Sequence, residues 1–301
     1  MPAGCCRAAD SMDRGVRLYN PVLPLLFFHP SIHSESSPVV EFHQIAAALY
    51  LAAGVGALLG VVVGSARMER GAAWGLALGA VVQGFGFATL HRLENAPPVT
   101  DLPMAVSLMA WMGVAFLLAL MWRLRIPALA AVIGPVAFLA VFVGALHLVD
   151  RPAGGLTASG SWPHIHVLLG SAGLGLLGLA GIAGVFFLVE HRRLKAKRGV
   201  GRPSVLPSLE ALDRVNAIAL AAGFPLLTLG LMTGVLWLQE VHGVPWVGSS
   251  HEVWMVIAWG IYAGLALARF VGHQGARQAA ASAVAGFAFL IFAVVGIGVL
   301  A

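Results

Sequence analysis

The sequence predicts an all-α integral membrane protein, a polytopic bundle of about eight transmembrane helices with both termini outside the membrane. Of its 301 residues 59% are hydrophobic and only 10% are charged, and the mean hydropathy is +0.88. Soluble domains carry about 25% charged residues. Charge-poor apolar stretches of about 20 residues, long enough to cross roughly 30 Å of hydrocarbon as a helix, recur along most of the chain. The main solvent of this protein is therefore lipid.

Residues 1–42 are expected to form an irregular extension. The apolar piece "PVLPLLFFHP" within it is short and interrupted by prolines, so it neither spans a membrane nor resembles a signal peptide. Residues 43–301 then form the transmembrane domain. Its spans are expected near 43–65, 72–91, 103–122, 127–147, 164–190, 214–239, 252–270 and 279–301.

Basic residues alternate between the loops and set the orientation. The segment "HRRLKAKRGVGRP" after the fifth span holds six lysines and arginines and no acid, and arginine pairs follow the first, third and seventh spans. Cytoplasmic loops carry an excess of Lys and Arg, so these loops belong inside and both termini outside. The net charge of +5 reflects this distribution and is no evidence for nucleic acid as a partner.

Motifs for catalysis are missing from the sequence. It contains no GxSxG, HExxH or Walker motif, so neither hydrolytic nor nucleotide chemistry is indicated. Cys5 and Cys6 are the only cysteines, and without CxxC or CxxCH they suggest neither a thiol relay nor covalent haem attachment.

In this topology histidines gather at the outer face: His43, His91, His147, His164, His166, His242 and His251. Imidazole is the commonest metal ligand and a usual axial ligand of haem iron. Trp162, Trp237, Trp246 and Trp254 fall in the same layer. One interpretation is a metal or haem site, and the other is that histidine and tryptophan suit a half-hydrated interface. Composition leaves both open.

Two long segments carry a family resemblance. "WPHIHVLLGSAGLGLLGLAGIAGVFFLVEHRRLKAK" and "LPSLEALDRVNAIALAAGFPLLTLGLMTGVLW" resemble the cytochrome c assembly family, which includes CcsA, ResC and HemX. In that family a tryptophan-rich outer loop, WGxxWxWDPKExW, comes next, followed by a span that ends in YAxxLHxR. The resemblance covers roughly residues 43–301 and is most specific from 162 to 269. The eight-span plan resembles the HemX-like branch.

The resemblance implies haem handling. CcsA-type members move haem to the outer face, or hold it there, for attachment to apocytochrome c. By position, His166 matches the histidine that opens the fifth span, which makes it the candidate axial ligand of a non-covalent b-type haem. The other residues implied to bind the cofactor are Trp162, His242, Trp246, His251, Glu252 and Trp254.

The chain departs from the family pattern at several positions. His242 replaces the first tryptophan of the loop, and His251 replaces its lysine. Leu267 replaces the histidine of YAxxLHxR. The second axial ligand is therefore unknown, with His242, His251, His147 and His164 as alternatives.

Two functions follow as hypotheses. The first is a membrane protein of cytochrome c biogenesis that binds or presents haem at the outer face, together with an assembly partner protein. The second is a HemX-like regulator or scaffold of haem biosynthesis that acts through a partner enzyme and binds no haem. Both describe an assembly or regulatory factor rather than a catalyst. Both place the chain, surrounded by lipid, in the bacterial cytoplasmic (inner) membrane.

Overall fold

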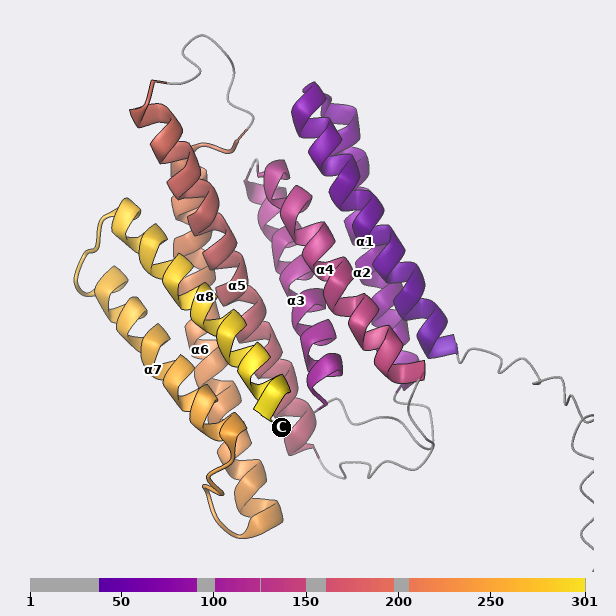
Figure 1. Cartoon of the computed structure of the whole chain (residues 1–301), viewed down its shortest axis with the longest axis vertical. Helices are drawn as coiled ribbons and strands as arrows, with labels where there is room; N and C mark the ends of the chain where they lie inside the picture. The colour runs from indigo at the N-terminus through magenta and orange to yellow at the C-terminus, as the bar shows by residue number, and fades with distance from the viewer. Residues whose placement is uncertain (1–37, 91–100, 125, 150–160, 198–205, 301) are drawn as a thin grey trace, which may run out of the picture. The chain divides into compact units, whose positions relative to one another are not determined.

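The structure, a computed structural model, describes residues 38–90, 101–124, 126–149, 161–197 and 206–300 (Figure 1). All regular secondary structure within these ranges is helical. The helices are α1 (Pro38–Val63), α2 (Ala66–Leu90), α3 (Leu102–Arg123), α4 (Pro127–Val149), α5 (Trp162–Lys195), α6 (Leu209–His242), α7 (Ser250–Phe270) and α8 (Ala276–Leu300). Each is long and apolar enough to cross a membrane. The predicted all-α, multi-pass membrane bundle is confirmed.

Several helices extend beyond the predicted spans. α1 begins at Pro38, inside the predicted extension, and residues 1–37 lie outside the described part. α6 begins after Ser208, whose hydroxyl accepts a hydrogen bond from the backbone N–H of Ala211 at 3.2 Å, and it ends at Gly243, which has a φ of 70°. A cap of the first kind sets the start of a helix and a cap of the second kind sets its end, whatever the polarity of the terminal turns. Hydropathy marks only the lipid-embedded part of a helix, so it predicted shorter elements.

The helices pack as two groups of four. α1 lies against α2 and α4, and α3 lies against α4 (Figure 1). In the second group α5 packs along α6 and α8, and α7 contacts both α6 and α8. The main contact between the groups is that of α3 with α5. Helix α5 thus belongs to the core of the bundle, and it is the most buried of the eight spans.

Glycine makes the contact between α5 and α6 close. A Cβ atom on Gly173 would lie 2.6 Å from the backbone nitrogen of Leu227, and one on Gly230 would lie 2.8 Å from that of Gly170. Neither position has room for a side chain. Small residues allow this kind of backbone approach between helices in a bilayer.

Consecutive spans run in opposite directions, so histidines and arginines collect at opposite ends of the bundle. The starts of α1 and α5 share one end with the finishes of α4 and α6. We call it the histidine end, and its described histidines are His43, His147, His164, His166, His242 and His251. We call the opposite end the arginine end, and its described arginines are Arg67, Arg70, Arg123, Arg192, Arg193, Arg214, Arg269 and Arg277. His91 lies outside the described residues.

Candidate functional site

At the histidine end, residues 243–249 join α6 to α7. Ser249 caps α7: its hydroxyl accepts the backbone N–H of Glu252 at 3.3 Å and donates to Oε1 of the same residue at 2.7 Å. The other carboxylate oxygen, Oε2, accepts the backbone N–H groups of Val247 and Gly248 at 2.9 and 3.0 Å. Glu252, a predicted site residue, therefore holds the loop in shape.

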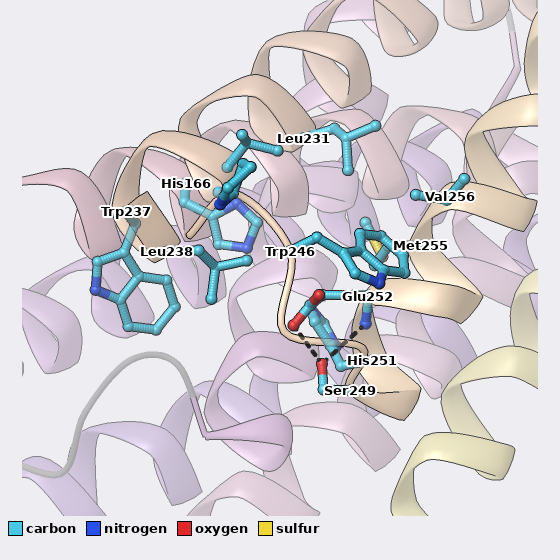
Figure 2. Close-up of a pocket in the computed structure, with 13 residues that line it drawn as sticks. His166, Leu231, Trp237, Leu238, Trp246, Ser249, His251, Glu252, Met255 and Val256 are labelled. Carbon is cyan, nitrogen blue, oxygen red and sulfur yellow. Dashed lines mark hydrogen bonds between the residues drawn. The ribbon is translucent and has the colours of Figure 1, made fainter. Parts of the chain in front are cut away.

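A cavity of about 250 Å³ lies between this loop, α6, the start of α7 and the start of α5 (Figure 2). Its walls are mostly apolar. Four predicted site residues line it: His166, Trp246, His251 and Glu252. The fold brings these four together although His166 is about 80 positions away from the others in the sequence.

His166 is held in a defined orientation at the side of the cavity. Its Nδ1 donates a hydrogen bond to the carbonyl oxygen of Gly230 at 2.7 Å, because a carbonyl can only accept. The ring also fits against Gly234, where a Cβ would lie 2.8 Å from the imidazole. Its second nitrogen, Nε2, forms no hydrogen bond within the described residues. A basic nitrogen with fixed direction is therefore left for a ligand.

His251 and Trp246 complete the arrangement from the other side. His251, in the first turn of α7, lines the same cavity as His166. Trp246, in the loop, is 48% exposed, and its indole lies across the cavity near Glu252 (Figure 2). The cavity is thus bordered by two imidazoles and an indole.

Three predicted residues do not line the cavity. Trp254 packs on α8, and its ring centroid lies 5.9 Å from that of Phe289 and 5.5 Å from that of Phe292. It is two positions beyond Glu252, about 200° around the helix, so its side chain leaves on another face. His242 and Trp162 are exposed at the end of α6 and the start of α5.

Other lining residues were not among the predicted site residues. The ring of Trp237 lies 6.2 Å from that of His166, and Met255 places a thioether in the cavity wall. On α6, Leu231, Gly234, Val235 and Leu238 recur at helical spacing and form one wall. The pattern Ser-x-x-Glu at Ser249 and Glu252, a capping-box signature, would have revealed the loop's own hydrogen bonds.

The donor set favours a haem over a bare metal ion. No three His, Cys, Asp or Glu side chains in the described ranges come together as a metal site. Haem iron takes only one or two protein ligands, which one or two imidazoles supply. The volume of about 250 Å³ is below the range of about 300–1,000 Å³ usual for small-molecule pockets. A bound haem would therefore extend beyond the cavity.

Comparison with known proteins places the chain in a family. Residues 99–301, which contain α3 to α8, match the family model of the cytochrome c assembly protein. The chain belongs to this family. The CcsA-like part of the predicted resemblance is confirmed, whereas membership of the HemX-like branch stays a prediction.

Relatives with the name cytochrome c biogenesis protein CcsA match a shorter segment. That of Thermosynechococcus vestitus is 33% identical over 119 residues, 36% of this chain and 37% of the relative. That of Picosynechococcus is 35% identical over 99 residues, 33% of this chain and 29% of the relative. One from Prochlorococcus marinus is 35% identical over 95 residues, covering 32% and 30%. The match spans about a third of the length of these relatives.

Proposed function

We propose that this protein serves cytochrome c biogenesis by holding haem non-covalently at the histidine end of the bundle, with His166 as an axial ligand. In this proposal the histidine end faces outward from a bacterial cytoplasmic membrane, as the basic loops predict. The family membership and the names of the CcsA relatives support the biological process. An assembly partner that delivers or accepts the haem belongs to the same proposal.

The hydrogen bond from His166 to Gly230 carries the proposal. A histidine that ligates a metal nearly always donates its other ring N–H to a carboxylate, carbonyl or water, which fixes the tautomer and makes the ligating nitrogen more basic. Here Nδ1 makes this bond at 2.7 Å, so Nε2 carries the lone pair. Haem supplies a porphyrin iron with open axial positions. The rings of Trp237 and Trp246 offer apolar faces for the macrocycle.

His251 is the strongest of the four alternatives for a second ligand. It lines the same cavity as His166, whereas His147, His164 and His242 do not. His251 stands where the family's loop has a lysine, so a ligand here would depart from the family pattern.

Haem titration of the purified protein tests the proposal. Hemin added to the protein in detergent should produce a Soret band that saturates at one haem per chain. His166→Ala should weaken binding at least tenfold, because the axial bond is lost. His164→Ala is the matched control, since His164 is exposed two positions earlier and outside the cavity. No saturable band, or equal effects of the two substitutions, would refute haem binding at His166.

The second ligand is tested by the spin state. His251→Ala should convert a six-coordinate low-spin spectrum into a five-coordinate one, while His242→Ala leaves the spectrum unchanged. A spectrum unaffected by His251→Ala would exclude His251 as the ligand and leave the role of His166 intact.

One observation favours the HemX-like alternative. Ser249 and Glu252 stand at positions of the family's haem loop. Their side chains cap α7 and hydrogen-bond to residues 247–248, so the loop is stable without a ligand. If hemin does not bind, and a haem-biosynthetic enzyme is retained by the immobilised protein, the regulatory function replaces the first proposal.

A further inference from the structure

At the arginine end, the first half of α2 and the end of α3 enclose a groove of about 790 Å³. On α2 its floor is formed by Ala66, Ala73 and Ala77, which share one helix face at spacings of seven and four. On α3 it is bordered by Leu118, Met121 and Trp122. The volume lies within the usual range for a ligand site.

Helix α2 packs more closely on α1 than on α3. Glycines bring α2 against α1: a Cβ on Gly60 would lie 2.9 Å from the backbone nitrogen of Glu69, and one on Gly79 would lie 2.7 Å from the Tyr50 ring. Further along, Nε1 of Trp111 on α3 donates to the carbonyl of Ala80 on α2 at 2.7 Å. The groove lies between this contact and the arginine end.

Charged and aromatic side chains lie along the groove in the order that the head group and the acyl chain of a lipid would need. Arg70 lines the groove one turn from Trp74. Its Nε donates to the carbonyl of Ala66, and its Nη groups make no hydrogen bond within the described residues. Trp74 is 77% exposed and Trp122 is 90% exposed. Arg67 and Arg123 adjoin the lining residues. Glu69 also lines the groove, and its one negative charge leaves the three arginines in excess.

We propose that this groove binds an anionic phospholipid, with the phosphate at Arg70 and an acyl chain between Trp74 and Trp122. Basic pockets between transmembrane helices near one membrane face recognise anionic head groups. From Ala66 to Ala77 the groove is about 16 Å long at 1.5 Å per residue. From Arg70, where the phosphate binds, to Ala77 it is about 10 Å long, which lies within one leaflet, about half of the roughly 30 Å hydrocarbon core. A partner's transmembrane helix needs the full thickness, and the Trp111–Ala80 contact closes that path.

Native mass spectrometry of the purified protein tests the site. Phosphatidylglycerol and phosphatidylcholine with identical acyl chains are titrated separately, and phosphatidylglycerol should bind at least tenfold more tightly. Arg70→Gln should weaken phosphatidylglycerol binding about fivefold, the value for one arginine near a membrane surface. Arg192→Gln, the same charge change at the exposed end of α5, is the matched control and should leave binding unchanged.

A second variant tests the acyl-chain part. Ala73→Leu with Ala77→Leu fills the groove and should lower the affinity for both lipids, and the thermal midpoint of each variant shows that it is folded. Equal affinity for the two lipids, equal effects of Arg70→Gln and Arg192→Gln, or unchanged binding by a folded filled-groove variant would each overturn the proposal. So would a photo-cross-linker at residue 77 that captures a polypeptide instead of lipid.

Discussion

Nη2 of Arg269, near the end of α7, donates to both carboxylate oxygens of Asp213 on α6, at 2.8 and 2.9 Å. The arginine and aspartate side chains are 13% and 29% exposed, and Nη1 of Arg269 also donates to the carbonyl of Gln274 at 3.3 Å. The pair joins α6 to α7 at the arginine end of the bundle, opposite the cavity. Because the pair is partly buried, removing one partner costs more than it does in an exposed ion pair.

Asp213→Asn should lower the free energy of unfolding by about 1–2 kcal/mol, because the charged acceptor is lost while the shape is kept. Thermal unfolding in detergent measures the change. Glu210→Gln is the control: the Glu210–Arg214 pair lies one turn away on the same helix, but its side chains are 84% and 57% exposed. Its loss should cost less than about 1 kcal/mol. Equal effects would show that burial does not strengthen the Asp213 pair.

Gly173→Ala should destabilise the contact between α5 and α6. The added methyl group would meet the backbone of Leu227, which cannot rotate away, so we expect a loss of about 1–3 kcal/mol. Gly260→Ala makes the same chemical change in α7, where no atom of the described residues lies within 4 Å of the new methyl group. That variant should be neutral or slightly more stable, since alanine favours helix. A stable Gly173→Ala protein would contradict the close packing.

A polar network inside the first group of helices gives another prediction. The Tyr50 hydroxyl donates to Oε1 of Gln83 at 2.8 Å, and Nε2 of Gln83 donates to the hydroxyl and carbonyl of Ser107 at 3.0 and 3.1 Å. Hydrogen bonds between membrane helices average about 0.6 kcal/mol and reach about 1.7. A double-mutant cycle of Tyr50→Phe and Gln83→Leu should return a coupling energy in that range.

Tyr262→Phe provides the control for the hydroxyl. The Tyr262 hydroxyl is buried and has no hydrogen-bond partner within the described residues. Its removal should therefore leave the stability unchanged or raise it, because no bond is lost and a buried polar group disappears. If Tyr50→Phe were equally harmless, the network would contribute nothing to stability.

Glu252→Gln should loosen the loop that carries Trp246. The carboxylate accepts two backbone N–H groups and one hydroxyl, and losing the charge weakens all three bonds. A cost of about 1–2 kcal/mol corresponds to a roughly 5–30-fold rise in local opening. Hydrogen exchange of residues 243–249 measures it, with Glu240→Gln at an exposed position of α6 as the control. Unchanged exchange would mean that the loop is held by other contacts.

The fold could be predicted from the sequence because length, hydropathy and the distribution of arginine each constrain it strongly. The gathering of His166, Trp246 and His251 at one end also followed from counting spans. The direction of each side chain did not follow from the sequence. Trp254 was assigned to the cofactor because the family resemblance matches its sequence position, which gives no side-chain direction, and its ring packs on Phe292.

The hydrogen-bond partners inside the bundle could not be predicted from the sequence either. Nothing in the pattern around Gln83 selects Tyr50 and Ser107 as its partners, since which helices are neighbours depends on packing. The roles of the glycines are similar. Their abundance indicates close helix contacts, but only the structure shows that Gly173 meets Leu227 while Gly260 has no neighbouring atom among the described residues.

The contact of α3 with α5 has a mechanical consequence. A Cβ on Gly175 of α5 would lie 3.0 Å from the backbone nitrogen of Gly113 on α3, so two bare backbones touch at this point. Around this point side chains fill the contact, and Phe116 of α3 packs against the buried cluster that contains Leu176 and Ala180 of α5. Because α3–α5 is the main contact between the two four-helix groups, the position of the helices around His166 relative to the first group depends chiefly on this one contact.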